Sequence, residues 1–409
     1  MTRRMEQVTI ERLGHQGDGI AAGPVFVPGT LPGELVEGEI SGGVMGAPRI
    51  LTPSEMRVSP PCRHAKSCGG CQLQHARPDF VALWKQDVVR HALAAHGIEA
   101  AFREIATSPE QTRRRAGFSA KRTKKGAQVG FHRKRSDVIV EVPDCRVIDP
   151  KLAAALPLVE ALAVLGASRK AELSVMVTTS QGGLDVVAKG GKEADAQMQQ
   201  QLSELARQHE CARIAWGEDV VLTRRPPMQK MGRAEVSPPP GAFLQATPQG
   251  EAALLADVLE HIDGASHVVD LFAGCGTFAL PIAERARVHA VEGDRAMTQA
   301  LDHGWRHAQG LRHVTTEARD LFRNPLLPAE LARFDAAVID PPRAGAEAQV
   351  AQLCEAKIPR IAFVSCNPVT FAREAAALLR AGYQLDGLRV VDQFRWSTHI
   401  ELVAGFKRQ

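Results

Sequence analysis

The sequence predicts an α/β protein in three parts, the last of which is a doubly wound parallel sheet. Its 409 residues suffice for roughly two to three domains. After a proline-rich connection at 236–243, strand-like runs such as HVVDLF and RIAFVSC alternate with helix-like runs, which is typical of a parallel sheet covered by helices. Because composition also changes near residue 57, we place the domains at 1–57, 58–235 and 236–409.

The two N-terminal parts differ in pattern. Residues 1–57 contain short alternating runs such as VTIERL and GELVEGEI, separated by glycines that permit tight turns, and this predicts a small closed β structure. Residues 58–235 combine a cysteine cluster, an amphipathic helix (FVALWKQDVVRHALAAHG) and strand-like runs such as ELSVMVTT. This mixture predicts a central α+β domain.

The net charge of +4 conceals a strongly basic segment at 113–135. The segment holds ten lysines and arginines and no aspartate or glutamate, so the rest of the chain is net acidic. Positive charge concentrated at one place favours a polyanionic partner, and we expect a nucleic acid there. Phe118, Phe131 and His132 could stack on bases or fill a strand core, and the sequence leaves both interpretations open.

Composition excludes several classes of protein. With 44% hydrophobic and 23% charged residues, the chain is neither disordered nor collagen-like. No apolar run is long enough to span a membrane, and no apolar core follows the basic start MTRRMEQVTI as in a signal peptide. We expect a cytoplasmic monomer without membrane contact, whose eight cysteines stay reduced and serve as metal ligands, nucleophiles or core residues.

A cofactor site is predicted where DLFAGCGTF (270–278) ends an apolar strand. Gly274 and Gly276 would let a ligand approach the backbone at the C-terminal end of that strand. The next strand ends in Glu292, about twenty residues after the first glycine, a spacing suited to hydrogen bonds with ribose hydroxyls. Because the full G-x-G-x-x-G pattern is absent, NAD and S-adenosylmethionine both remain open at this point.

Two later strand ends separate these cofactors. DPPR (340–343) places Asp340 at one strand end and SCNP (365–368) places Cys366 at the next, and in an open parallel sheet both face the crevice beside the glycine turn. Hydride transfer needs no cysteine there. Methylation of a pyrimidine at carbon 5 does, because a thiolate that adds to carbon 6 makes carbon 5 nucleophilic. Such a thiol needs a lowered pKa, and Glu401, opening the last strand, is the predicted base for the carbon-5 proton.

These motifs resemble the RNA 5-methyluridine (uracil-5-) methyltransferase family, in its iron–sulfur-containing 23S rRNA branch. The matching segments, in family order, are FLQATPQGE (243–251), DLFAGCGTFALP, VEGD, DPPRAG, SCNP and THIEL. The resemblance implies a Rossmann-like class I methyltransferase fold, S-adenosylmethionine as cofactor, Cys366 as nucleophile and Glu401 as base. It also implies a cofactor site lined by Gln245, Phe272, Thr277, Glu292, Asp320 and Asp340.

Two positions depart from the family pattern. Thr247 stands where the family usually has asparagine, and Thr277 stands where many members have it. We expect the first change to weaken a contact near the methionine group or the target base. Neither change removes a catalytic group.

The N-terminal parts extend the resemblance. Residues 6–55, with GDGIA and FVPGTLPGE, resemble a TRAM domain, an OB-like β-barrel that binds RNA. Three cysteines cluster and a fourth lies far downstream, a set able to hold a [4Fe-4S] cluster or a zinc ion: Cys62, Cys68, Cys71 and Cys145. Zinc sites usually have two close pairs, and the resemblance implies [4Fe-4S]. Zinc and a chance grouping of cysteines stay as alternatives. Methyl transfer from a sulfonium is redox-neutral, so a cluster would support the structure or position RNA.

The predicted function is S-adenosylmethionine-dependent formation of 5-methyluridine in RNA through a covalent bond between Cys366 and carbon 6 of uracil. By analogy with family branches, the cysteine set favours 23S rRNA over tRNA. Alternatives are a tRNA 5-methyluridine methyltransferase, an RNA 5-methylcytosine methyltransferase and a catalytically silent iron–sulfur RNA-binding protein. DPPR argues against the cytosine enzymes, which typically carry a second cysteine there. Cys366, Glu401 and Glu292 argue against a silent protein.

Overall fold

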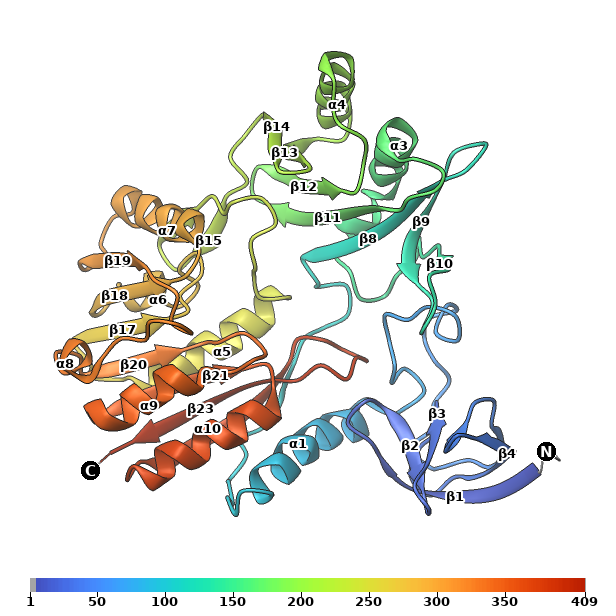
Figure 1. Ribbon diagram of the computed structural model, residues 1–409, viewed down its shortest axis with the longest axis horizontal. Helices are drawn as coiled ribbons and strands as arrows, with labels where there is room; N and C mark the ends of the chain where they lie inside the picture. The colour runs from blue at the N-terminus through green and yellow to red at the C-terminus, as the bar shows by residue number, and fades with distance from the viewer. Residues whose placement is uncertain (1–4, 409) are drawn as a thin grey trace.

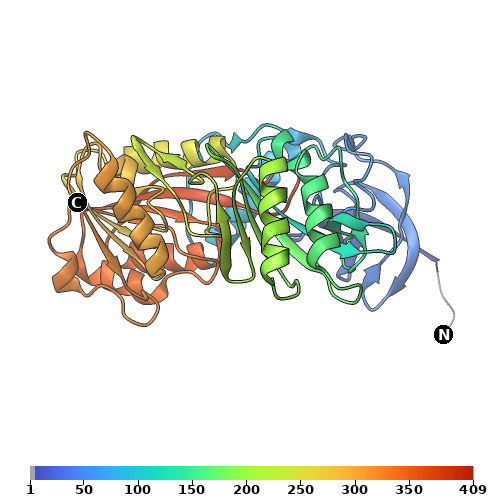
Figure 2. The same cartoon turned by 90° about the horizontal axis from the view of Figure 1, so that it is seen from above.

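The computed structural model describes residues 5–408, which form three large sheets and one short hairpin. Figure 1 shows the N-terminal, central and C-terminal sheets as separate groups of strands. Seen from above, the three groups follow one another along the longest axis of the molecule (Figure 2). None of the helices in the described range is long and apolar enough to cross a membrane.

The N-terminal sheet closes on itself. Its six strands are β1 (Met5–Leu13), β2 (Asp18–Ala21), β3 (Val25–Pro28), β4 (Leu35–Ser41), β5 (Val44–Met45) and β6 (Arg49–Thr52). β1 pairs with both β2 and β4, so the order β1-β2-β3-β5-β4 returns to β1. Closure buries Ile10, Val27, Val36 and Met45 on the inside. The closed β structure predicted from the glycine-separated runs is therefore present.

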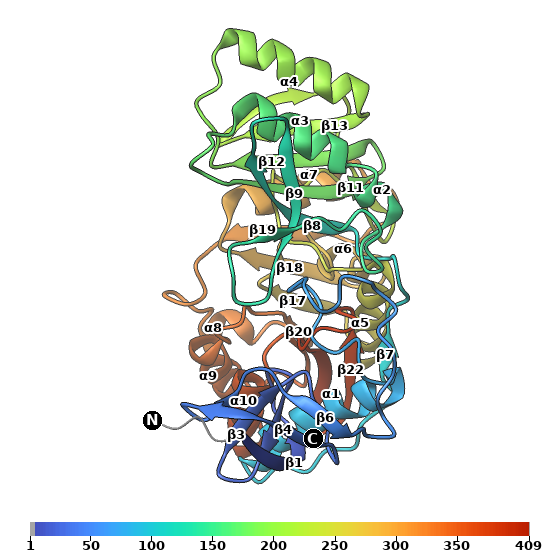
Figure 3. The same ribbon diagram turned by 90° about the vertical axis from the view of Figure 1, so that its right-hand side faces the viewer.

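The central sheet has the strand order β10-β9-β8-β11-β12-β13-β14. The strands are β8 (Arg115–Arg122), β9 (Ala127–His132), β10 (Ile139–Val140), β11 (Leu173–Ser180), β12 (Gly183–Lys189), β13 (Cys211–Trp216) and β14 (Asp219–Thr223). The helices are α2 (Pro150–Ala153), α3 (Leu156–Gly166) and α4 (Ala196–Gln208). Figure 3 shows α3 and α4 on the side of this sheet that faces away from the C-terminal sheet. Leu162 and Leu202 of these helices pack against Phe118 and Val175 of the strands.

The C-terminal sheet has the order β19-β18-β17-β20-β21-β23-β22-β7, and its first five strands run parallel. The strands, after a hairpin of β15 (Gln229–Met231) and β16 (Ala234–Val236), are β17 (His267–Leu271), β18 (Arg287–Glu292), β19 (Val314–Ala318), β20 (Ala336–Ile339), β21 (Arg360–Ser365), β22 (Gln384–Asp392) and β23 (Glu401–Lys407). The helices are α5 (Pro248–His261), α6 (Ala279–Ile282), α7 (Arg295–His307), α8 (Pro328–Leu331), α9 (Glu347–Ala356) and α10 (Pro368–Arg380). Val268 and Val338 belong to one apolar core, whereas Val269 and Ile339 belong to the other. Helices thus cover both faces of a parallel sheet, as the alternating pattern predicts.

The chain from α1 (Pro78–Ala94) to β7 (Ala106–Thr107) departs from the predicted division into domains. It falls within the segment expected to form the central domain, yet α1 packs against α10 and β7 pairs with β22. Val89 of α1 belongs to the C-terminal core, and the fully buried Lys85 places its Nζ 2.6 Å from Asp392 Oδ1. The amphipathic pattern of α1 predicts a buried face but does not specify the partner, which here is the C-terminal sheet.

Candidate active site

The candidate active site lies at the edge of the C-terminal sheet where its parallel strands end. The last residues of β17, β18, β20 and β21 at this edge are Leu271, Glu292, Ile339 and Ser365. The antiparallel strand β23 begins at the same edge, because Ser365 pairs with Leu402. Cys366 follows Ser365, and Glu401 precedes Leu402. The register of β21 and β23 therefore places Cys366 opposite Glu401. The sheet therefore brings together the predicted nucleophile and the predicted base.

Carboxyl groups surround the thiol of Cys366. Burial and the negative charges of Glu401 and Asp340 raise its pKa to about 12, with Arg343 acting in the opposite direction. Burial raises the pKa of Glu401 well above its ordinary value, and Asp340 adds to the effect. Burial also raises the pKa of Asp340 to about 7. The expectation of a lowered thiol pKa is therefore wrong for the chain alone, because burial and the two carboxyl groups together outweigh the effect of Arg343.

The glycine turn after β17 holds Glu292 beside an open backbone. Phe272, Gly274 and Gly276 have φ angles of 64°, 55° and 99°, and no heavy atom lies within 4 Å of a Cβ built on Gly274. The Gly274 N–H donates to Glu292 Oε2 at 3.0 Å, and the Asp294 N–H donates to Oε1 at 2.9 Å. These bonds fix the carboxylate at the place where a ligand could reach the turn, and carboxylates there suit ribose hydroxyls.

Aromatic and acidic side chains complete this side of the site. The Phe272 ring contacts Phe322 at a centroid distance of 5.4 Å, and Asp320 Oδ1 accepts a hydrogen bond from the Phe322 N–H at 3.0 Å. Thr277 lies partly exposed in the turn. Asp270 is fully buried and its carboxylate has no hydrogen-bond partner in the described chain, while burial and the charge of Asp340 raise its pKa. Aromatic faces, a carboxylate held at the glycine turn and buried carboxyl groups together fit S-adenosylmethionine, which is a cation carrying an adenosine.

Gln245 reaches the site from the connection before α5. Its Nε2 donates to Asp340 Oδ2 at 3.3 Å, and its Oε1 accepts from Gln393 Nε2 at 2.6 Å. Gln393 Oε1 in turn accepts from the backbone N–H of Ala246 at 2.8 Å. Sequence reasoning missed Gln393, because it follows a strand without a motif and its partner lies 148 residues earlier.

Thr247 forms part of the helix start, and its effect on a contact with the methionine group or the target base stays a prediction. Its Oγ1 accepts a hydrogen bond from the Gly250 N–H at 3.0 Å, which caps the N-terminus of α5. The same oxygen lies 2.7 Å from Ser108 Oγ, which joins α5 to the segment after β7. Threonine serves at an N-cap nearly as well as asparagine, so this departure from the family pattern is compatible with an intact site.

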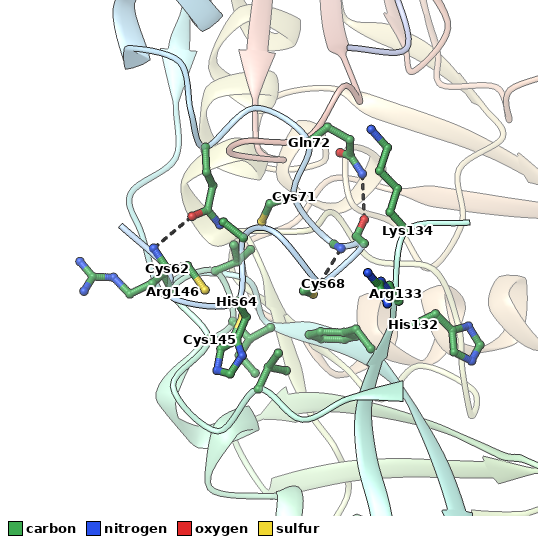
Figure 4. A pocket seen from close by; sticks show the side chains of 18 of the residues that line it. Cys62, His64, Cys68, Cys71, Gln72, His132, Arg133, Lys134, Cys145 and Arg146 are labelled. Carbon is green, nitrogen blue, oxygen red and sulfur yellow. Dashed lines mark hydrogen bonds between the residues drawn. The ribbon is translucent and has the colours of Figure 1, made fainter. Parts of the chain in front are cut away.

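Four cysteines line a second cavity, of about 510 Å³: Cys62, Cys68, Cys71 and Cys145. Figure 4 shows their side chains coming from the cysteine loop (62–75) and from the segment around Cys145. All four are free thiols. Burial and the charges of the other three thiols together raise the pKa of Cys71 to about 12, so the sulfurs lie within electrostatic reach of one another. Over residues 5–408, no group of three or more His, Cys, Asp or Glu has an arrangement that could hold a metal ion. The structure thus brings the four predicted ligands to one cavity, and the metal itself stays a prediction.

Backbone contacts hold the cysteine loop in place. The Gly69 N–H donates to the His132 carbonyl at 2.9 Å, and a Cβ on Gly69 would lie 2.8 Å from that oxygen, so the close approach requires glycine. The N–H groups of Gln72 and Leu73 donate to the Trp396 carbonyl at 2.8 and 2.9 Å. The cysteine loop is therefore attached to the segment that leads into Glu401.

The basic segment 113–135 has buried and exposed parts. Arg114 is buried, forms an ion pair with Glu251 and donates to the Gln245 carbonyl at 2.9 Å, so it links the central sheet to the candidate site. Phe118 is buried and stacks on Phe131 at 5.3 Å, so this ring fills the core. Arg113 and Arg115 are half-buried, and the other cations lie in two exposed groups.

The first exposed group, here called the hairpin cations, lies at the turn between β8 and β9: Lys121, Arg122, Lys124 and Lys125. In the part of the chain that the structure describes, their side chains form no ion pair. The second group, Arg133 to Arg135, lines the cysteine cavity. Lys134 and Arg135 lie 3.3 and 3.0 Å from the Asp18 carboxylate of the N-terminal sheet.

The family model and the relatives that this chain matches are described as RNA methyltransferases. Residues 306–408 match the family model described as tRNA (uracil-5-)-methyltransferase. The chain is 41% identical over 401 residues to an uncharacterized RNA methyltransferase of Brucella suis, and the match covers 97% of each chain. It is 33% identical over 432 residues to the 23S rRNA (uracil(1939)-C(5))-methyltransferase RlmD of Vibrio campbellii, covering 100% of this chain and 97% of that protein.

A solved structure shares the fold. The crystal structure of Pyrococcus abyssi tRNA (uracil-54, C5)-methyltransferase in complex with S-adenosyl-L-homocysteine matches with a TM-score of 0.77. The match covers 98% of this chain and 99% of the other at 21% sequence identity. The architecture of all three parts is thus shared with a protein crystallised with the demethylated form of the cofactor.

Proposed function

The chain belongs to the RNA (uracil-5-)methyltransferase family and is an S-adenosylmethionine-dependent enzyme, and on that premise we propose that it forms 5-methyluridine in 23S rRNA through a covalent adduct on Cys366. The observation that carries the proposal is the strand register. It sets Cys366 opposite Glu401, at the sheet edge that also carries the glycine turn and Glu292.

The cofactor supplies the methyl group as a sulfonium, and the residues suited to hold it surround the glycine turn. Phe272 and Phe322 offer aromatic faces, while Glu292 offers oxygens for the ribose. We assign the remaining contacts to Gln245, Thr277, Asp320 and Asp340. Within residues 5–408, no cation offsets the raised pKa values of Asp270 and Asp340, which favours a positively charged ligand.

The chemical step follows from the two residues at the strand edge. The Cys366 thiol gives up its proton to water, and the sulfur forms a bond to carbon 6 of uracil. The resulting enolate makes carbon 5 the nucleophile that accepts the methyl group. The Glu401 carboxylate then removes the proton from carbon 5. The electron pair of that C–H bond restores the 5,6 double bond, and the bond between sulfur and carbon 6 breaks. Glu401 is suited to this step, because its raised pKa makes the carboxylate a stronger base than an exposed glutamate.

We assign Cys62, Cys68, Cys71 and Cys145 to a [4Fe-4S] cluster. The donor set fits, since four free thiols from two segments face one cavity. The cluster would join the cysteine loop to the end of the basic segment and support the RNA-binding face. A zinc ion is the alternative occupant.

RNA would be held by two regions besides the active site. We assign the closed N-terminal sheet to a TRAM-like, OB-like barrel that contacts RNA. We assign the domains to 1–57, 58–235 and 236–409, with α1 and β7 of the second segment packed on the third. The hairpin cations are exposed and form no ion pair with any residue from 5 to 408, which favours contacts with phosphates. The target uridine would leave its stack to reach Cys366. We expect the enzyme to act as a monomer in the cytoplasm.

Mass spectrometry of RNA from cells with and without the gene tests the function. Nuclease fragments of 23S rRNA should lose one 5-methyluridine in the deletion strain and regain it when purified enzyme and S-adenosylmethionine are added. Loss of the methyl group from tRNA instead would redirect the proposal to a tRNA enzyme, and loss of a 5-methylcytosine would overturn the choice of base.

A further inference from the structure

A chain of side-chain amides behind Asp340 has only one consistent hydrogen-bond arrangement. It starts at the backbone N–H of Ala246, a group that can only donate, which lies 2.8 Å from the Gln393 side chain. The Gln393 oxygen must therefore face Ala246, and its NH2 group must face Gln245 at 2.6 Å. Gln393 is 2% exposed, so water does not offer its amide another partner.

The same logic fixes Gln245. Its oxygen accepts from Gln393, so its NH2 group points the other way and donates to Asp340 Oδ2 at 3.3 Å. Gln245 is also 2% exposed. If its amide rotated by half a turn, two NH2 groups would face each other on one side, and an oxygen would face the Asp340 carboxylate on the other. The backbone N–H of Ala246 thus fixes the orientation of the Gln393 amide, and the Gln393 amide fixes the orientation of the Gln245 amide at the candidate site.

The Gln245 NH2 group, a donor, therefore lies beside the Asp340 carboxyl oxygens, which are acceptors, near the predicted nucleophile Cys366. Asp340 is close enough to Cys366 and Glu401 for its charge to act on both. Uracil offers an oxygen at carbon 4 and an N–H at position 3, whereas cytosine offers an amino group and a bare nitrogen at those positions. Gln245 and Asp340, which we also assign to the cofactor, present an N–H and an oxygen that are complementary to the uracil edge. With Gln245 rotated, its oxygen would instead accept from the cytosine amino group.

We propose that Gln393 is a positioning residue that locks the Gln245 amide in the orientation selecting uracil over cytosine. The inference rests on the proposed function, since it presumes a pyrimidine held beside Cys366. Gln393 acts through Gln245 and does not itself touch the base. It contributes discrimination between two bases rather than chemical reactivity.

The decisive variant is Gln393→Glu, which keeps the shape but changes which atoms can donate. An ionised carboxylate would accept from Ala246 and from the Gln245 NH2 group, and so would reverse the Gln245 amide. A protonated carboxyl would accept from Ala246 and donate to Gln245, as the native amide does. The variant should therefore prefer uracil at low pH and lose that preference as pH rises through the pKa of the new carboxyl.

The measurement compares covalent trapping by two RNAs that carry 5-fluorouridine or 5-fluorocytidine at the mapped target position. Fluorine cannot leave as a proton, so either base that is accepted stays bound to the enzyme. In Gln393→Glu we expect the ratio of uracil to cytosine trapping to fall by roughly 10- to 100-fold at high pH, the range that one base-edge contact pair is worth. In the wild type the ratio should keep favouring uracil over the same pH range.

Two further variants keep the test informative. Gln349→Glu is the matched control, because Gln349 is also fully buried and bonded through both amide atoms, to Leu326 N at 2.8 Å and Leu326 O at 3.2 Å, on α9. It should leave the trapping ratio unchanged at every pH. Gln393→Met removes the lock without adding charge, and should lower the ratio independently of pH.

The proposal would be overturned if both Gln393 variants bind S-adenosylmethionine as the wild type does and also keep the wild-type ratio of uracil to cytosine trapping. If wild-type enzyme traps neither RNA, the proposed function fails instead, so the two failures are distinct. If Gln393→Glu does not fold, the ratio measured in Gln393→Met decides the question.

Discussion

Two regions of this molecule hold partly buried thiols, and the charged side chains around them differ in sign. At the edge of the C-terminal sheet, Cys366 lies beside the carboxyl groups of Glu401 and Asp340. In the cysteine cavity, the four thiols share the lining with cations: Arg113, Arg133, Lys134, Arg135 and Arg146. In both regions burial raises thiol pKa values, and for Cys366 and Cys71 to about 12.

The difference indicates what each region receives. A thiol among carboxylates stays protonated until a positive charge arrives, so Cys366 is suited to work only when a cationic cofactor is present. Thiols among cations can be held together as thiolates around an inorganic group, and the same cations favour an anionic partner outside. One region is thus adapted to a reaction, and the other to holding a structure beside RNA.

Removing each thiol in turn gives the sharpest contrast. Cys366→Ala should lower turnover by roughly 10⁴-fold or more, because the nucleophile is removed while the strand end can accept a small side chain. It should still bind S-adenosylmethionine and should form no adduct with 5-fluorouridine RNA on a denaturing gel. Cys71→Ala, its counterpart in the cavity, should still form the adduct once enzyme and RNA are concentrated enough to associate. An adduct with Cys366→Ala would end the assignment of the nucleophile.

Glu401→Gln should separate the two halves of the reaction. The amide keeps the shape of the side chain but cannot accept the carbon-5 proton, so a methylated protein–RNA adduct should accumulate on ordinary uridine RNA. Turnover should fall by roughly 10²- to 10⁴-fold, the usual contribution of general base catalysis. Intact-protein mass spectrometry detects the adduct and its added methyl group. Multiple turnover at the wild-type rate would show that another group is the base.

The metal content of the purified protein tests the assignment of a [4Fe-4S] cluster to the cysteine cavity. Protein purified without oxygen should be brown and should contain four irons and four sulfides per chain, as a [4Fe-4S] cluster requires. Cys145→Ser should lose this content and unfold at a lower temperature, since metal-binding energy also stabilises the fold. S-adenosylmethionine affinity should change little, because the glycine turn belongs to another sheet. One zinc and no iron would replace the cluster by a zinc site and leave the methyltransferase assignment intact.

The charge argument at Cys366 predicts a pH dependence. With a pKa of about 12 the thiol is protonated at neutral pH, so its alkylation by iodoacetamide should rise roughly tenfold per pH unit from pH 7 to 10. S-adenosylmethionine should accelerate alkylation at pH 8, because its sulfonium favours the thiolate. S-adenosylhomocysteine fills similar space without that charge and is the matched control. Peptide mapping measures the rate at Cys366, and equal rates with the two ligands would refute the argument.

The hairpin cations should give the smallest effect. Replacing Lys121, Arg122, Lys124 and Lys125 by alanine should weaken RNA binding and lower the slope of log Kd against log salt by roughly 0.7 to 0.9 for each phosphate that is no longer bound. Cofactor affinity should not change. Arg114 is left in place, since its ion pair with Glu251 links two parts of the molecule. An unchanged slope would move the RNA-binding surface to the cysteine cavity and the N-terminal sheet.

Local patterns in the sequence are enough to predict several features of this protein. Alternating strand-like and helix-like runs predict the doubly wound sheet, and the rule that parallel strands end at one edge predicts that Asp340, Glu292 and Cys366 meet there. Glycines and short alternating runs predict the closed N-terminal sheet. These features are predictable because periodicity, turn residues and strand-end motifs act within a few residues of the chain.

Other features depend on distant partners, and the folded chain alone reveals them. The packing of α1 on the C-terminal sheet, the amide chain from Ala246 through Gln393 to Gln245, and the link between Thr247 and Ser108 each join segments far apart in the sequence. The mechanism leads us to expect a lowered pKa for Cys366, yet its pKa is raised, because the direction depends on which charges the folded chain places near the sulfur. A motif predicts which residue stands at a strand end, but burial and neighbouring charge are set only when the strands come together.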